Sequence, residues 1–416
     1  MKFRSHTLEN GLEIVAECND RAHSVGLGFF VRTGARDETD ELAGVSHFSE
    51  HMVFKGTPRR SADDVNREFD EIGAHYNAFT SEENTVYYAA VLPEYQEASI
   101  DLLADIMRPS LRDEDFQMEK KVILEEIQMY ADQPPFGMDD HIKVLHYGDH
   151  PLARSVLGTA ETVGQLTVDQ MRNYFQARYS PGNVFVAAAG RVDFDALVEQ
   201  VDQRCRDWPA LPTEREVPPP NSKAAFESVS RPSATQQYIL QLCDAPASED
   251  DDRYAAKLLA TLVGDDSGSR MYWELVDPGL VESASLGHYE YLGAGMFFTW
   301  VSCEPENAQS VFEHLQRVIQ QAESDGFSEA ELQQAKNKVQ SRVVLGSELP
   351  RSRLFNVGGN WLQRREYRSV ADDLAAVDAV TLEQLHAVLA SYPLSRRTTV
   401  TIGPCEEKGM SLNTSQ

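Results

Sequence analysis

Two histidines and a glutamate stand close together near residue 50, at a spacing that suits metal chemistry. They are His47, Glu50 and His51, in the run HFSEH. On a helix, His47 and His51 are one turn apart and project from one face, so both imidazoles can reach a single ion. Glu50 falls near the same face. Two neutral nitrogens suit zinc, and a nearby carboxylate suits the removal of a proton from an attacking water.

The residues around this motif indicate that its helix packs against a core. Phe48 lies within the motif, Met52 directly follows it, and the helical pattern ends at Gly56. The alternative is a pair of histidines on a solvent-exposed helix, which would leave these apolar side chains exposed to water. We therefore expect the histidines to line a cleft or an edge.

A catalytic zinc needs a third protein ligand, and a carboxylate is the usual complement to two histidines. The predicted helix 113–130 offers Glu119, Glu125 and Glu126 among Phe, Val, Ile and Leu residues. Glu119 and Glu126 are two turns apart and share a face. The same spacing fits the solvated face of an ordinary amphipathic helix, so the residues alone leave the third ligand open.

The elements that must position these residues form two similar halves. Residues 209–222, PALPTEREVPPPNS, contain five prolines and separate residues 1–208 from residues 223–416 as a linker. In both halves a strand-like run ending in proline precedes a helix, as in LPEYQEASIDLLADIM and CEPENAQSVFEHLQRVI. The pattern predicts an α+β fold of two similar domains, each a mostly antiparallel sheet with helices on one face.

The composition excludes several classes of function. The chain has 416 residues, 42% of them hydrophobic, which is enough for packed domains. Its 66 acidic and 38 basic residues give a net charge of −28, which argues against nucleic-acid and anionic-membrane partners. The sequence shows neither a signal peptide nor a long apolar run, and its five cysteines are widely spaced. A cytoplasmic protein with reduced cysteines is expected.

Over nearly its full length the sequence resembles the pitrilysin/insulinase family of zinc metallopeptidases. The resemblance is to the short-chain branch that includes mitochondrial processing peptidase and its bacterial homologues. It rests on HFSEHMVFKGT, GAHYNAFTSEENTVYYAAVLPEY, EKKVILEEIQMYADQP, and VLGTAETV followed by YSPGNVFVAAAGRVD. The first of these contains the reversed H-x-x-E-H signature. The resemblance implies a duplicated LuxS/processing-peptidase-like fold in which the first domain carries the metal motif and the second lacks it.

The resemblance also implies a role for each residue of the candidate site. His47, His51 and Glu126 are implied to bind one Zn²⁺ per chain, and Glu50 is implied to be the general base. Glu119 matches the family's additional acidic position, which supports the site from behind the ligands.

Substrate contacts are implied at three further positions. Asn77 and Ala78 are implied to lie on an edge strand that pairs with the substrate backbone, although Asn77 by itself equally fits a turn. Arg270 matches a family position in the second domain. The family's substrate-holding Arg and Tyr, however, align with Pro278 and Glu282 in the run LVDPGLVES.

Three interpretations of this difference remain open. A second, different subunit of the family could supply the Arg and Tyr, which is the interpretation we favour. Arg270, Tyr289 or Tyr291 could substitute for them, so that a homodimer or a monomer suffices. Lastly, the chain could bind zinc and cleave slowly or not at all.

We therefore expect a zinc-dependent endopeptidase that hydrolyses extended peptides or unfolded protein segments in a cavity between domains or subunits. The main alternative is a non-catalytic core or assembly subunit of a heteromeric peptidase complex. A small-molecule metallohydrolase is disfavoured because nothing marks a dedicated small pocket. The ligand types narrow the metal to a zinc-like divalent ion without fixing its identity.

Overall fold

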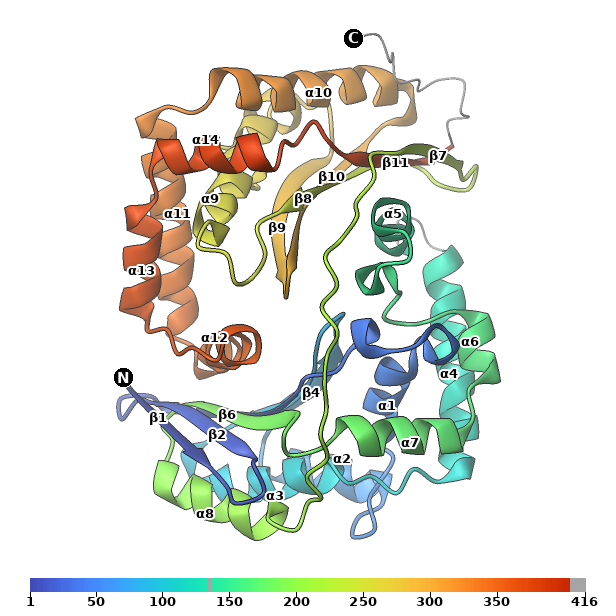
Figure 1. Cartoon of the computed structure of the whole chain (residues 1–416), viewed down its shortest axis with the longest axis vertical. Helices are drawn as coiled ribbons and strands as arrows, with labels where there is room; N and C mark the ends of the chain where they lie inside the picture. The colour runs from blue at the N-terminus through green and yellow to red at the C-terminus, as the bar shows by residue number, and fades with distance from the viewer. Residues whose placement is uncertain (133–136, 405–416) are drawn as a thin grey trace. The chain divides into compact units, whose positions relative to one another are not determined.

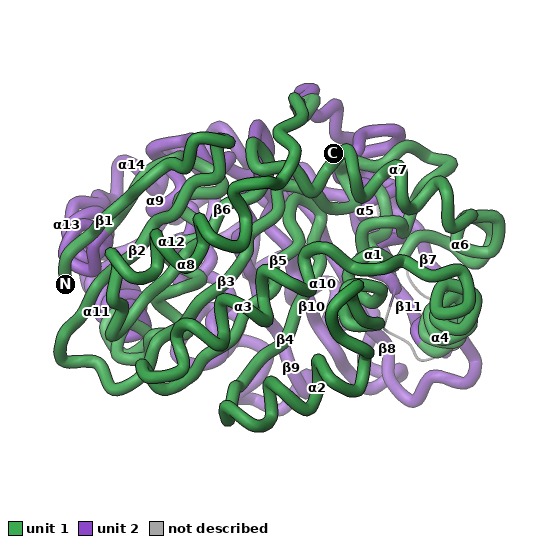
Figure 2. Tube along the Cα trace, turned by 90° about the horizontal axis from the view of Figure 1, so that it is seen from below, with its two compact units in different colours: residues 1–129, 154–216, 344–368 green, residues 130–153, 217–343, 369–416 purple. Residues whose placement is uncertain are grey.

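A computed structural model of the chain describes residues 1–132 and 137–404. The chain divides into two compact units, coloured green and purple in Figure 2. Unit 1 comprises residues 1–129, 154–216 and 344–368, and unit 2 comprises residues 130–153, 217–343 and 369–416. Each unit is thus built mainly from one half of the sequence and includes a segment from the other half.

Unit 1 is built on a six-stranded sheet (Figure 1). Its strands are β1 (Lys2–Thr7), β2 (Glu13–Cys18), β3 (Val25–Val31), β4 (His75–Thr80), β5 (Thr85–Val91) and β6 (Val184–Gly190). They lie in the order β1-β2-β6-β3-β5-β4, so β4 forms one edge. The neighbours β2 and β6 are parallel, and the other neighbours are antiparallel.

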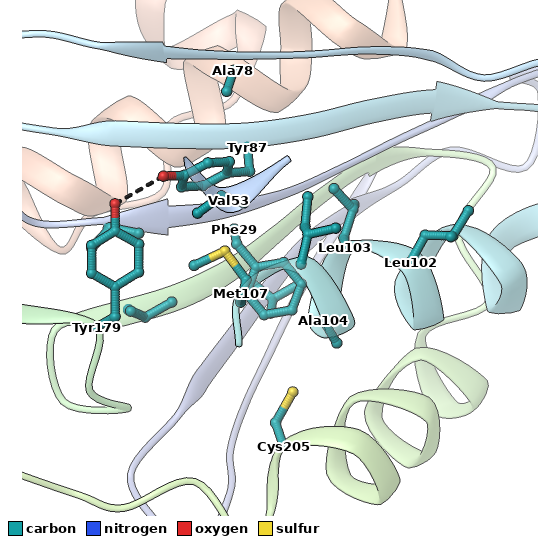
Figure 3. Close-up of a cluster of buried hydrophobic side chains, with 14 of the residues drawn as sticks. Phe29, Val53, Ala78, Tyr87, Leu102, Leu103, Ala104, Met107, Tyr179 and Cys205 are labelled. Atoms are coloured by element: carbon teal, nitrogen blue, oxygen red, sulfur yellow. Dashed lines mark hydrogen bonds between the residues drawn. The ribbon is translucent and has the colours of Figure 1, made fainter. Parts of the chain in front are cut away.

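The helices of unit 1 cover both faces of this sheet. They are α1 (Val45–Val53), α2 (Ala62–Glu71), α3 (Gln96–Ile106), α4 (Asp113–Asp132), α6 (Ala160–Gln165), α7 (Val168–Arg178), α8 (Phe194–Cys205) and α12 (Pro350–Arg364). Strand residues alternate between the faces, and Phe29 and Tyr87 enter the larger core, part of which is drawn in Figure 3. Phe30 and Phe185 point the other way, where α12 from the second half of the sequence covers them.

Unit 2 repeats the architecture. Its strands are β7 (Phe226–Ser230), β8 (Gln237–Ala245), β9 (Ser283–Tyr291), β10 (Ala294–Cys303) and β11 (Thr398–Gly403). Their order, β7-β11-β8-β10-β9, matches β2-β6-β3-β5-β4 strand for strand, and the one parallel pair, β7 with β11, corresponds to β2 with β6. The predicted duplication of an α+β unit is confirmed.

The helices of unit 2 also lie on both faces of their sheet. They are α5 (Met138–Tyr147), α9 (Arg253–Gly264), α10 (Ala308–Asp325), α11 (Glu329–Ser347), α13 (Val370–Ala379) and α14 (Leu382–Ser391), with a π-helical turn at Tyr272–Val276. Helix α5 comes from the first half of the sequence, and its Ile142 packs in one cluster with Leu240 and Val400 of the sheet. The expectation of helices on one face is therefore incomplete, because α5 and α12 cover the second faces.

The proposed linker has no helix or strand anywhere in residues 209–222. Residues 209–216 belong to unit 1 and residues 217–222 to unit 2. The division into residues 1–208 and 223–416 follows the two homologous halves along the sequence and stays a prediction. Each compact unit also contains a helix from the other half, α12 in unit 1 and α5 in unit 2.

Two expectations about the rest of the chain can be compared with the structure. Cys18, Cys205, Cys243 and Cys303 are free, while Cys405 lies outside the described residues. Among the described residues no single helix is long and apolar enough to cross a membrane. The pair α13 and α14, bent by 82°, reaches that length and composition only when taken together.

Candidate metal centre

Helix α1, which carries both histidines, is held at its N-terminus by a buried carboxylate. It begins after Gly44, whose φ of 93° is readily adopted only by glycine. Glu38 accepts hydrogen bonds from the backbone N–H groups of Gly44 and Ser46, each at 2.7 Å. Burial raises the pKa of Glu38 to about 8, although both hydrogen bonds act to lower it. Glu38 was not predicted from the sequence, in which its only signal is an acidic residue ahead of a helix start.

Helix α1 lies against helix α4 through two aromatic rings (Figure 1). Phe48 of α1 and Phe116 of α4 are fully buried and stack with centroids 4.6 Å apart. Three residues after Phe116, Glu119 reaches His51 of α1, and two turns further along α4 the carboxylate of Glu126 lies near both histidines. The packing of these two rings thus positions the carboxylates of α4 against the imidazoles of α1.

His47, His51 and Glu126 present three ligand atoms that lie within 4.8 Å of one another. The carboxylate Oε2 of Glu126 is 3.9 Å from His47 Nε2 and 4.0 Å from His51 Nε2. These separations are short enough for one ion to reach all three ligand atoms after small shifts of the side chains. Two imidazole nitrogens and one carboxylate are also the donor set of many catalytic zinc sites. The three residues fit the ion.

The two histidines are prepared differently for metal binding. Burial, together with the neighbouring charge of His51, lowers the pKa of His47 to about 4, so His47 is neutral at pH 7. Burial also acts to lower the pKa of His51, but the hydrogen bond from its Nδ1 to Glu119 Oε1, at 2.9 Å, and the surrounding carboxylates raise it overall. This bond places the Nδ1 proton toward Glu119 and leaves Nε2 free to bind a cation.

Glu119 is buried, and each of its two carboxylate oxygens has a partner. Its Oε2 atom is 2.6 Å from Lys55 Nζ, and its Oε1 atom is bound to His51. Burial acts to raise the pKa of Glu119, but the hydrogen bonds to His51 and Lys55 outweigh this effect and lower it. Lys55 was not predicted as part of the site, although it lies in the same run as the histidines, HFSEHMVFKGT.

Glu50 lies beside the cluster and is oriented by a hydroxyl group. The Thr80 hydroxyl, at the end of β4, donates to Glu50 Oε2 at 2.6 Å. Burial raises the pKa of Glu50 despite this hydrogen bond and the nearby His51, and the charge of Glu126 acts in the same direction as burial. A carboxylate whose pKa is raised toward neutrality is suited to accept and return a proton. Thr80 was not predicted from the sequence.

Asn77 and Ala78 lie on β4 at the edge of the sheet, as the resemblance implied. The Ala78 N–H donates to the side-chain Oδ1 of Asn77 at 2.9 Å. This bond satisfies a backbone N–H on the open side of β4, where the described residues supply no further strand. The Asn77 side chain is exposed, so an extended peptide could displace it and pair with this edge.

The remaining predicted residues belong to unit 2. Arg270 is bound within that unit, where it pairs with Glu331 at 3.2 Å and stacks over the ring of Phe327 at 4.4 Å. Pro278 and Glu282 lie in the turn between the π-helical turn and β9. Glu282 donates its backbone N–H to the carbonyl of Ser302, and its carboxylate accepts a hydrogen bond from the Gln236 amide. Neither Pro278 nor Glu282 supplies the guanidinium or phenol group that the resemblance implies at these positions.

Comparisons with known proteins agree with this architecture. Residues 13–160 match the family described as insulinase (peptidase family M16), and residues 165–339 match its companion, described as the peptidase M16 inactive domain. A Mycobacterium tuberculosis protein named as an uncharacterized zinc protease is 34% identical, over 95% of this chain and 91% of its own length. A probable mitochondrial-processing peptidase subunit beta of Arabidopsis thaliana is 27% identical and covers 97% and 79% respectively.

A solved structure shows the same fold. The crystal structure of a protease from Helicobacter pylori superposes with a TM-score of 0.89 at 22% identity, over 96% of this chain and 99% of that one. The family models, the relatives and the histidine cluster lead to one conclusion. The chain belongs to the insulinase family of peptidases, peptidase family M16.

Proposed function

We propose that this chain is a zinc-dependent endopeptidase that hydrolyses extended peptides or unfolded protein segments. The observation that carries the proposal is the convergence of His47, His51 and Glu126 within 4.8 Å, with Glu50 beside them. The names of relatives as zinc proteases support it. In this proposal His47, His51 and Glu126 hold one zinc ion. When bound, zinc lowers the pKa of a water molecule and polarises a peptide carbonyl.

The chain's own residues supply the proton transfers. Glu50 takes the proton of the attacking water at its carboxylate and returns it to the leaving amine. Thr80 holds the Glu50 carboxylate in one orientation through the 2.6 Å hydrogen bond. Glu119 keeps the Nδ1 proton of His51 in place, so that its Nε2 stays available to the cation.

Strand β4 binds the substrate in this proposal. An extended peptide adds to the open edge as a further strand, with Asn77 and Ala78 meeting its backbone. Main-chain pairing of this kind recognises extended conformation and requires no fixed side-chain sequence. It therefore favours peptides and unfolded segments over folded proteins.

The segment that follows the π-helical turn of unit 2 favours a second candidate function. Pro278 and Glu282 stand where the family's Arg and Tyr are implied, and Arg270 is held by Glu331. A homologous subunit that supplies the missing pair would complete the site, and the Arabidopsis relative is itself named as one subunit of a processing peptidase. Without such a partner, the chain would serve as a core or assembly subunit with little activity.

Metal analysis and peptide cleavage distinguish these candidates. The purified chain should contain one zinc ion, and should cleave a quenched-fluorescence peptide library in a reaction that a chelator abolishes and zinc restores. Full metal content without cleavage, followed by cleavage once a homologous chain with the Arg/Tyr segment is added, would select the heteromeric enzyme. Cleavage that survives metal removal would contradict both.

A further inference from the structure

The turn that joins β4 to β5, residues 81–84, lies against a buried cluster that includes four charged side chains. Arg36 Nη1 pairs with Glu83 Oε1 at 2.6 Å. Arg215 donates to the Asp37 carboxylate through Nε at 2.9 Å and through Nη2 at 2.6 Å, and it also donates to the backbone carbonyl of Glu83. The side chains of Arg36, Asp37 and Glu83 are no more than 3% exposed. Two positive and two negative charges therefore balance one another around the turn.

The backbone of the turn is bound to the same segment of the chain. The N–H groups of Ala35 and Arg36 donate to the carbonyls of Ser81 and Glu82, at 3.2 and 2.8 Å. The turn is thus fixed from one side by residues 35–37 and from the other by Arg215. The position of Thr80, directly before the turn, depends on these contacts.

Thr80 connects the turn to the proposed general base. Its hydroxyl donates to Glu50 Oε2 at 2.6 Å, and Thr80 is the last residue of β4 to pair with β5. Asn77 and Ala78, earlier on β4, are held in register by their own pairing with β5. A shift of the turn should therefore move the Thr80 hydroxyl more than the edge that binds substrate in the proposed function.

Arg215 comes from the linker, residues 209–222, and is 132 residues away from Glu83 in the sequence. Residues 209–216 belong to unit 1, so all of these contacts lie within one compact unit. The linker is also bound at Thr213, whose hydroxyl donates to the carbonyl of Ala177 in α7 at 3.1 Å. This second hydrogen bond fixes the linker at α7 and not at the turn.

We propose that Arg215 is a positioning residue, which fixes the β4–β5 turn and, through Thr80, the orientation of the Glu50 carboxylate. The inference rests on the proposed peptidase function and gives the linker a role beyond joining the two halves of the sequence. Arginine suits this role because its planar guanidinium group donates to the Asp37 carboxylate and the Glu83 carbonyl at the same time. The single ammonium group of lysine does not reproduce such a forked contact.

Arg215→Lys tests this role without leaving a buried carboxylate unpaired. The lysine keeps a positive charge beside Asp37, whereas an apolar residue would leave the Asp37 charge buried without its main partner. Thr213→Val is the matched control, because it removes a linker hydrogen bond that does not reach the turn. Both variants should fold and keep the zinc content of the wild type.

Steady-state cleavage of one quenched peptide measures kcat and KM separately. Arg215→Lys should lower kcat by about tenfold and leave KM within about twofold, because the general base is misplaced while the substrate edge keeps its register. Thr213→Val should equal the wild type in both constants. A wild-type kcat in Arg215→Lys, or a change in KM alone, would overturn the inference.

A double-variant cycle shows whether Arg215 acts through Thr80. Thr80→Val removes the hydroxyl that orients Glu50 and should by itself lower kcat by about tenfold. If Arg215 acts through this hydroxyl, Thr80→Val/Arg215→Lys should be no slower than Thr80→Val alone. Losses that multiply in the double variant would contradict the positioning role.

Hydrogen exchange separates this inference from the proposed function. The Ser81 N–H donates to the Asn84 carbonyl at 2.8 Å, so a fixed turn protects this amide from exchange. Exchange at residues 81–84 should be faster in Arg215→Lys than in the wild type and in Thr213→Val, with α8 unchanged in all three chains. This result supports the role of Arg215 even if the wild type proves unable to cleave, which would count against the proposed function alone. Equal exchange at residues 81–84 in the three chains, or an equal rise in α8, would overturn the inference.

Discussion

His47 and His51 lie one helical turn apart, yet their surroundings shift their pKa values in opposite directions. Burial and the neighbouring His51 lower the pKa of His47, so its imidazole is neutral at pH 7. Glu119 raises the pKa of His51 and fixes the ring nitrogen that faces the cluster. The i and i+4 spacing predicts that both rings reach one ion, but it carries no information about which residue orients each ring.

The clearest residue-scale prediction concerns Glu119. Glu119→Gln keeps the shape of the side chain but removes the charge that pairs with His51 and Lys55. Loss of such an outer carboxylate typically weakens metal binding by about 10–100-fold. Competition with a chelating dye at pH 7 should show this rise in the zinc Kd.

Glu125 offers a matched control for Glu119 on the same helix. It is exposed, so Glu125→Gln removes an equal charge without touching a ligand. Its zinc Kd should equal that of the wild type. A Glu119→Gln chain that binds zinc as tightly as Glu125→Gln would show that Glu119 does not orient His51.

The limits of sequence at the residue scale are visible in the site itself. His47, Glu50 and His51 follow from helical spacing, whereas the choice of Glu126 over Glu125 depended on family resemblance. Thr80 acts across 30 residues of sequence, so no local pattern could reveal its contact with Glu50.

Helix α12 was not predicted from sequence patterns, and tertiary packing explains why it forms. Its run PRSRLFNVGGNWLQR contains adjacent glycines, which weigh against a helix by local propensity. A Cβ atom at Gly358 would overlap the ring of Phe30, so glycine is needed there for the helix to lie on the sheet. Local propensity and tertiary packing conflict at this position, and packing decides the structure.

The two glycines give an element-scale prediction with an internal control. Gly358→Ala should destabilise the chain by about 1–3 kcal/mol, because the methyl group forces α12 away from Phe30. Gly359→Ala meets open space and should be neutral or stabilising by up to about 1 kcal/mol. Urea unfolding of both variants checks the pair; equal stabilities would mean that α12 does not pack closely at Gly358.

A cluster of charges joins α3 to α8 and to the loop that follows α1. Asp101 of α3 accepts hydrogen bonds from Arg60 at 2.6 Å and from Arg204 of α8 at 2.9 Å. Burial acts to raise the pKa of Asp101, but the bonds from Arg60, Arg59 and Arg204 outweigh it and lower the pKa from 3.8 to about 2.

This shift predicts a pH-dependent contribution to stability. Because the pKa of Asp101 is lower in the folded state, its stabilisation is present above about pH 4 and is lost as the pH falls through about 2. Asp101→Asn should cost about 2 kcal/mol at pH 7, and its deficit relative to the wild type should shrink in acid. Unfolding free energies at a series of pH values measure this; a deficit that stays constant would contradict the assignment.

At the scale of the whole molecule, the sequence halves and the compact units differ by two exchanged segments. Residues 130–153 join unit 2, and residues 344–368 join unit 1. The repeat of strand and helix patterns predicted the duplicated sheets correctly. It could not predict the exchange, because an apolar helix face shows that a helix is buried without showing which sheet it covers.

The exchange predicts that the first half of the sequence does not fold fully by itself. A fragment of residues 1–216 lacks α12 and would expose the sheet face that includes Val15, Phe30 and Phe185, each no more than 2% exposed in the full chain. It should bind a hydrophobic dye strongly and aggregate. A monomeric fragment with no dye binding and the unfolding free energy of the intact chain would contradict this.

The central claim is that this chain binds zinc through His47, His51 and Glu126 and uses Glu50 to activate water. The most direct measurement is metal content alongside peptide cleavage for Glu50→Gln, with Glu125→Gln as the control. Glu50→Gln should keep one zinc per chain and lose activity by on the order of 10³-fold, while Glu125→Gln keeps both. A zinc-loaded Glu50→Gln chain that cleaves at the wild-type rate would contradict the claim.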